Sequence, residues 1–159
     1  MFALPWYSIL LISIPQTIFS ILIGFQLFNL RLDFRKCLIV AIGVGIVTYF
    51  LRGTFAIPGL HTLLIIVLMA LSITWINRGN ILYNFFSVIL GSMILGVIEG
   101  VWCPLILRLT FRSIQDLALN PWLNIALFIP VLLAAAMIYI IIHRQNFYIY
   151  DLNQKDIYR

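Results

Sequence analysis

The feature that most constrains this chain is a series of long apolar runs separated by short polar segments. Five such runs contain only one Asp, Glu, Lys or Arg between them, Glu99; they are residues 3–28, 37–51, 57–76, 81–105 and 122–142. A helix needs about 20 apolar residues to cross the hydrocarbon core of a bilayer. With 64% hydrophobic and 9% charged residues in 159, most of the surface must face lipid. The sequence predicts an all-α integral membrane bundle of about five transmembrane helices over residues 1–142, followed by a tail over residues 143–159.

The basic residues predict how this bundle is oriented. If the five runs alternate in direction, one side of the membrane receives seven Lys and Arg residues: Arg31, Arg35, Lys36, Arg78, Arg144, Lys155 and Arg159. The other side receives three: Arg52, Arg108 and Arg112. Because cytoplasmic loops carry the excess of Lys and Arg, the N-terminus is expected outside and the tail in the cytoplasm. Trp and Tyr residues near both ends of the runs fit interfacial belts.

Two segments between and within the runs carry weaker patterns. From Leu107 to Ala118, apolar residues fall on one helical face and charged residues on the other, which predicts a short interfacial helix between spans four and five. Span two, at 15 residues, is short for a membrane crossing. Span four carries Gly91, Gly96 and Gly100, a spacing that favours close approach of a neighbouring helix.

The residue types that most enzymes and metal sites need are scarce. The five acidic residues, two histidines and two cysteines form no paired carboxylates, nucleophile with a base, or cluster of metal ligands at a suitable spacing. We therefore expect no enzyme activity, no metal and no cofactor. The net charge of +5 is spread over isolated residues rather than a patch with interleaved aromatics, so no nucleic-acid partner is expected.

One group of polar residues is predicted to meet in the outer third of the membrane. Arg52 ends span two, His61 begins span three and Glu99 lies well inside span four. An ionised side chain inside a span costs about 2.5–3.5 kcal/mol, so Glu99 is expected to face the bundle interior and to pair, with Arg52 as the best candidate. That pair is either a structural ion pair or part of a ligand pocket. Gln16 and Thr48 are expected in the same interior, where lone polar residues commonly form hydrogen bonds between helices.

The connection between spans two and three resembles a known family. The residues that carry the likeness are Arg52, Pro58, Gly59, His61 and Thr62, preceded by the basic segment 31–36. This region resembles the membrane sensor region of Gram-positive histidine kinases of the accessory-gene-regulator type. The resemblance implies that Pro58 and Gly59 form a structural turn and that Arg52, His61 and Thr62 border a receptor mouth. The kinase part of that family is missing from this sequence.

Three functions are compatible with these features. The preferred one is a receptor-like sensor module in the bacterial cytoplasmic membrane, which detects an extracellular or lipid-phase signal and passes it to a partner. The alternatives are a small substrate-binding subunit of a transporter and a scaffold subunit of a cell-envelope complex. The expected partners are the lipid bilayer and either a protein, such as a kinase, transporter or envelope subunit, or a second copy of the chain.

Overall fold

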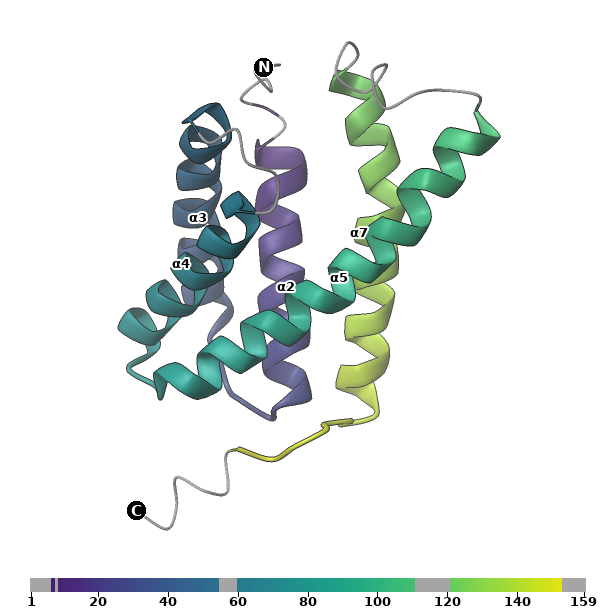
Figure 1. Cartoon of the computed structure of the whole chain (residues 1–159). Coiled ribbons are helices and arrows are strands. Elements are labelled where there is room, and N and C mark those ends of the chain that lie inside the picture. Colours follow the sequence, from purple (N-terminus) through teal and green to yellow (C-terminus); the bar gives the residue numbers. More distant parts are fainter. Residues whose placement is uncertain (1–6, 8, 55–59, 111–120, 153–159) are drawn as a thin grey trace.

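The computed structural model describes residues 7, 9–54, 60–110 and 121–152, together with the side chains of 7, 10–50, 62–110 and 122–152. The described regular structure is entirely helical, so the predicted all-α bundle is confirmed. Its elements are a π-helical segment η1 (Ile9–Ser13) and the helices α2 (Ile14–Leu27), α3 (Phe34–Thr54), α4 (Leu60–Asn77), α5 (Ile81–Leu109) and α7 (Pro121–Arg144). They stand side by side in Figure 1, with α5 running obliquely across the others.

Three of the helical segments are long and apolar enough to cross a membrane. They are Leu10–Leu27, Ile81–Leu109 and Trp122–Arg144, and Thr62–Asn77 is a shorter apolar helix. Much of the surface of these segments is exposed and apolar, including Met93, Val97 and Val101 on α5. Such a surface is stable against lipid chains and unfavourable against water. The chain is therefore a membrane helical bundle.

The helix that contains the second predicted span is longer than the sequence predicted. Helix α3 has 21 residues and a length of about 32 Å, and it continues through Gly53 instead of stopping before it. At the other end, a carboxylate oxygen of Asp33 accepts a hydrogen bond from the backbone N–H of Arg35 at 3.3 Å. Asp in this position caps a helix N-terminus. Arg35 and Lys36 therefore belong to the first turn of the helix and not to the preceding loop.

The other boundaries differ from the predicted ones by a few residues. Helix α5 continues to Leu109, so Leu107 and Arg108 belong to it, and the rest of the predicted interfacial helix lies outside the described residues. Helix α7 ends at Arg144. At the start of the chain, η1 runs directly into α2. Pro15 lies in the first turn of α2, where the missing backbone N–H of a proline is tolerated.

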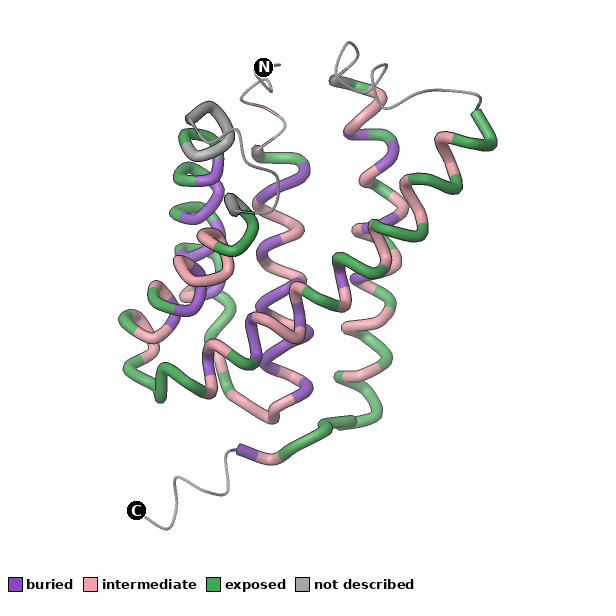
Figure 2. The backbone as a smooth tube through the Cα atoms, viewed as in Figure 1, coloured by how far each residue is buried: buried purple, intermediate pink, exposed green. Residues whose placement is uncertain are grey.

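Helix α2 is the centre of the bundle, and α5 crosses it at two glycines. A Cβ atom added to Gly24 would lie 1.9 Å from the carbonyl oxygen of Ser87, and one added to Gly91 would lie 1.9 Å from that of Ser20. Each helix thus offers a Ser and a Gly four residues apart, and the two backbones touch, as at other small-residue crossings in membranes. Figure 2 shows buried residues gathered where α2 and α5 cross.

Only part of the predicted glycine stripe takes part in this crossing. Gly91 packs closely, as predicted. Gly96 and Gly100 do not show such packing, because an added Cβ at either position would meet no atom of the described residues within 4 Å. Gly96 instead borders the cavity described below.

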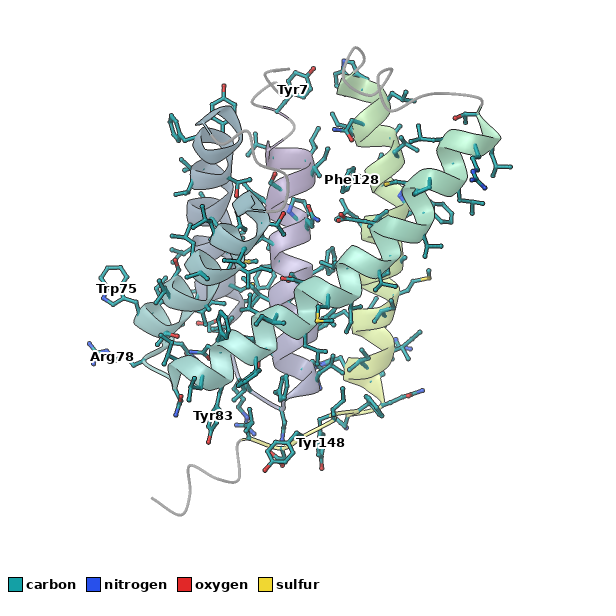
Figure 3. The ribbon with its side chains drawn as sticks, viewed as in Figure 1. Tyr7, Trp75, Arg78, Tyr83, Phe128 and Tyr148 are labelled. Atoms are coloured by element: carbon teal, nitrogen blue, oxygen red, sulfur yellow. The ribbon has the colours of Figure 1, made fainter. Side chains whose placement is uncertain are left out.

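Aromatic residues mark the two ends of the bundle. Tyr7 stacks on Trp122 with ring centroids 5.4 Å apart, which joins the start of the chain to the start of α7. Trp75, Tyr83 and Tyr148 lie at the opposite end in Figure 3. The sequence predicted Trp and Tyr residues at both ends of the runs.

Candidate functional site

A polar cavity lies among the helices on the side of the α2–α5 crossing nearer to the start of α4. Its volume is about 270 Å³, and η1, α2, α3, α4 and α5 all contribute to its wall. Eight of the described lining residues are polar: Ser13, Gln16, Thr17, Ser20, Thr48, Thr62, Ser92 and Glu99. The others are Ile65, Ile66, Met69, Leu95 and Gly96.

The polar wall comes mainly from one face of α2 and its π-helical start. Ser13, Gln16, Thr17 and Ser20 are spaced by three or four residues, so they line one side of a continuous helix. Ser92 and Glu99, two turns apart on α5, complete this wall. Helix α4 supplies Thr62 and the three apolar residues Ile65, Ile66 and Met69. The cavity is therefore amphipathic, with hydrogen-bonding groups on one side and a hydrocarbon surface on the other.

Glu99 is half-buried in the cavity wall and contacts α2. Gln16 Nε2 donates a hydrogen bond to Glu99 Oε1, which links the two helices directly. The prediction that Glu99 faces the bundle interior is consistent with this contact. The predicted partner, Arg52, lies in α3, but its side chain is outside the described residues, and the Arg52–Glu99 pair stays a prediction.

A pair of serines forms the floor of the cavity. The hydroxyls of Ser20 and Ser92 are hydrogen-bonded at 2.9 Å, and each lies next to the helix crossing made by Gly24 and Gly91. Below them the backbones of α2 and α5 are in contact, so no space remains between these two helices. The cavity ends here.

Two threonines of the wall, Thr17 and Thr48, have their hydroxyl protons already engaged. Thr17 donates to the carbonyl oxygen of Ser13 at 2.8 Å, and Thr48 donates to that of Val44 at 2.7 Å. A hydroxyl that donates to its own helix keeps its lone pairs as acceptors. Together with the carboxyl of Glu99, these groups make the wall rich in hydrogen-bond acceptors. A ligand that carries N–H or O–H donors fits such a wall best.

The structure brings three of the predicted pocket residues together. Gln16, Thr62 and Glu99 all line the cavity. Arg52 and His61 lie in α3 and α4, but their side chains are outside the described residues, as are Pro58 and Gly59 altogether. Among the described residues, no three His, Cys, Asp or Glu side chains are grouped so as to hold a metal ion.

Four lining residues were missed from the sequence: Ser13, Thr17, Ser20 and Ser92. A signal for the first three was present, because with Gln16 they form a polar stripe at helical spacing in an otherwise apolar run. Ser92 follows from the seven-residue separation to Glu99, which places both on one face. Because single small polar residues are common in membrane spans, such a stripe does not by itself indicate a cavity.

Comparison of the chain with protein families, with curated proteins and with solved structures finds no match.

Proposed function

We propose that this protein is a receptor-like sensor module of the bacterial cytoplasmic membrane, whose polar cavity binds a small ligand from the outer side. In this proposal the chain crosses the membrane five times, with its N-terminus outside and its tail in the cytoplasm. The observation that carries the proposal is the amphipathic cavity with eight polar lining residues inside an otherwise apolar bundle. Polar side chains in spans are costly and are commonly retained for function.

The closed floor of the cavity favours binding over permeation. A conducting path needs a polar route through the whole bundle, whereas α2 and α5 touch backbone to backbone directly below Ser20 and Ser92. A ligand that enters is therefore held between α2, α4 and α5. The expected ligand is a small molecule with hydrogen-bond donors along one edge and an apolar opposite edge. These edges match the acceptor-rich side and the apolar side of the cavity.

Helix α2 offers a route from the cavity to the tail. Its first turns carry Gln16, and its last carbonyls accept hydrogen bonds from the tail. Leu27 accepts from the N–H of Ile149 at 2.8 Å and of Tyr150 at 3.4 Å, and Phe28 accepts from that of Leu152 at 3.3 Å. A ligand that binds better to one position of α2 than to another would shift the tail as well. A cytoplasmic protein that contacts the tail would read this shift.

The polar content of the cavity also favours the second candidate, a substrate-binding subunit of a transporter. Such subunits hold water-soluble compounds in pockets rich in polar groups, and eight polar lining residues fit that chemistry better than the sequence led us to expect. The two functions differ in what happens to the ligand. A sensor releases it on the outer side, whereas a transport subunit, together with its partner ATPase, delivers it into sealed vesicles.

Ligand capture tests the proposal. The protein is purified from membranes in mild detergent, and bound small molecules are identified by native mass spectrometry of the intact complex. Gln16→Ala removes a hydrogen-bonding side chain from the cavity, and Glu99→Gln replaces its carboxylate acceptor with an amide; each is expected to lower ligand occupancy about tenfold.

Thr74→Val provides the matched control for these variants. It removes a hydrogen bond of the same kind, from Asn84 Nδ2 to Thr74 Oγ1 at 3.0 Å, between α5 and α4 but outside the cavity. Its ligand occupancy should equal that of the wild type. The proposal fails if Gln16→Ala and Glu99→Gln keep full occupancy and lose only stability, in the same manner as Thr74→Val.

A further inference from the structure

The end of the bundle opposite the cavity carries a concentration of positive charge. Arg31 precedes α3, Arg35 and Lys36 lie in its first turn, and Arg78 follows α4. Arg31, Arg35 and Arg78 are exposed. Among the described residues these cations form no salt bridge, and the nearby acid Asp33 is directed to the N–H of Arg35 as a helix cap. Their charge is therefore available to an external anion.

Asn77 joins these cations into one site. Its Oδ1 accepts a hydrogen bond from Lys36 Nζ at 3.2 Å, and its Nδ2 donates to the carbonyl oxygen of Arg31 at 3.4 Å. The loop before α3 is thus tied to the last turn of α4, directly beside Arg78. Four positive charges, Arg31 before α3, Arg35 and Lys36 in its first turn and Arg78 after α4, lie at one corner of the bundle, which we call the basic corner.

The basic corner adjoins a hollow with a partly apolar wall. The hollow is lined by Thr74, Trp75, Ile76, Arg78 and Gly79. Trp75 is 85% exposed, and Figure 3 shows Trp75 and Arg78 projecting from the same side of the bundle, away from the other helices. Exposed Trp is typical of the level where headgroups meet acyl chains. A charged region and a membrane-level aromatic residue therefore lie next to each other.

We propose that the basic corner is a binding site for an anionic phospholipid, with the headgroup phosphate held by Arg35, Lys36 and Arg78 and the glycerol and upper acyl chains lying against Trp75. Arginine matches phosphate with paired N–H donors, and basic pockets at the cytoplasmic ends of membrane helices attract anionic headgroups. A free phosphate ion would use the same cations but would gain nothing from Trp75 and Ile76. The lipid is thus the occupant that uses the whole surface.

Native mass spectrometry of the full chain in a non-ionic detergent tests this site. Phosphatidylglycerol and phosphatidylcholine with identical acyl chains are added separately, and the fraction of protein that carries one lipid is measured. We expect a clear preference for phosphatidylglycerol. The double variant Arg35→Gln with Arg78→Gln should bind phosphatidylglycerol about thirtyfold more weakly, since each basic residue contributes about a fivefold effect at an anionic surface.

Arg144→Gln is the matched control, because Arg144 is an exposed cation at the same end of the bundle but at the end of α7. It should keep the preference for phosphatidylglycerol. An equal loss in Arg144→Gln, or equal binding of the two lipids by the wild type, overturns the proposal. So does displacement of bound phosphatidylglycerol by inorganic phosphate at the same concentration, since that result would assign the site to a free anion.

Discussion

Gly24 and Gly91 are the two positions at which a single added carbon would collide with a facing backbone. Each Cβ would come within 1.9 Å of a carbonyl oxygen that belongs to a helix and has no freedom to move aside. Gly96 has the opposite surroundings, since within the described part of the chain no atom would lie within 4 Å of its added Cβ, although it lies on the same helix five residues from Gly91. Two glycines of one helix thus have different roles.

The first prediction compares these two glycines. Gly91→Ala is expected to destabilise the bundle by about 2 kcal/mol or more, because overpacking at a rigid contact forces the helices apart. Gly96→Ala should leave stability unchanged or raise it by up to about 1 kcal/mol, since alanine is the better helix former. Unfolding of the purified protein in mixed micelles with increasing dodecyl sulfate measures both. Equal effects of the two substitutions would contradict the observed crossing.

The second prediction concerns the serine pair at the floor of the cavity. A double-mutant cycle with Ser20→Ala and Ser92→Ala is expected to give a coupling energy of about 0.6 kcal/mol, the usual size of a hydrogen bond between membrane helices. The same unfolding assay supplies the four free energies. A coupling energy of zero would mean that the 2.9 Å contact does not stabilise the fold.

The sequence predicted which polar residues lie inside the bundle, but it did not predict which residues they contact. Glu99 and Gln16 were expected inside the bundle because the cost of exposing them to lipid is high, and both line the cavity. That Gln16 contacts Glu99 could not be read from the sequence, since a contact between α2 and α5 depends on the angle and register of their crossing. Those are set by Gly24 and Gly91 together, and one glycine alone fits many crossings.

At the scale of elements, the sequence predicted the number of long helices, but the residues at which they begin and end differ from the predicted ones. Long apolar runs identify spans because the bilayer fixes their length. Charged residues mislead at the ends, where Arg35 and Lys36 were assigned to a loop although Asp33 begins the helix before them. The long side chains of Arg and Lys reach the interface from inside a helix, so their charge does not mark its boundary.

The tail is an element that hydropathy did not predict. Residues after α7 cross the end of α2, and Leu152 is buried to 7% exposure while its N–H donates to Phe28. The side chain of His143 reinforces the approach, with Nδ1 lying 3.1 Å from Gln26 Oε1. The backbone carbonyl groups at the end of α2, which have no partner within the helix, thus accept hydrogen bonds from the tail.

The third prediction tests how firmly the tail is held. Leu152→Ser removes the buried anchor and is expected to speed hydrogen exchange at the amides of Ile149 and Tyr150 by about tenfold, because burial of a leucine contributes about 1.5–3 kcal/mol. Tyr148→Ser, at an exposed neighbouring position, is the control and should leave the rates of these amides unchanged. Hydrogen exchange followed by mass spectrometry gives both rates. Slow exchange in Leu152→Ser would show that the backbone bonds hold the tail without the leucine.

At the scale of the whole molecule, orientation in the membrane follows from charge and can be tested directly. Cys37 is fully buried, so its failure to react would say nothing about sidedness. In a background with both cysteines replaced by serine, Thr110→Cys and Tyr148→Cys instead provide exposed thiols at opposite ends of the bundle.

The fourth prediction is that a membrane-impermeant maleimide labels Thr110→Cys in intact cells and labels Tyr148→Cys only after the membrane is opened. The reason is the excess of basic residues at the end of the bundle that carries Tyr148. Gel-shift detection of the labelled protein measures both reactions. The reverse pattern would invert the proposed topology and place the cavity on the cytoplasmic side.

The backbone contact between α2 and α5 also divides α5 into two lever arms. From Gly91 the helix extends about 15 Å back to Ile81 and about 27 Å forward to Leu109, at 1.5 Å per residue. If α5 turns as a rigid rod about this point, a swing of about 2 Å at Leu109 displaces Ile81 by about 1 Å in the opposite direction. Ile81 is joined to α4 by the short loop that carries Arg78. In such a motion, widening the cavity would also move the basic corner, and a lipid bound at that corner would oppose the widening.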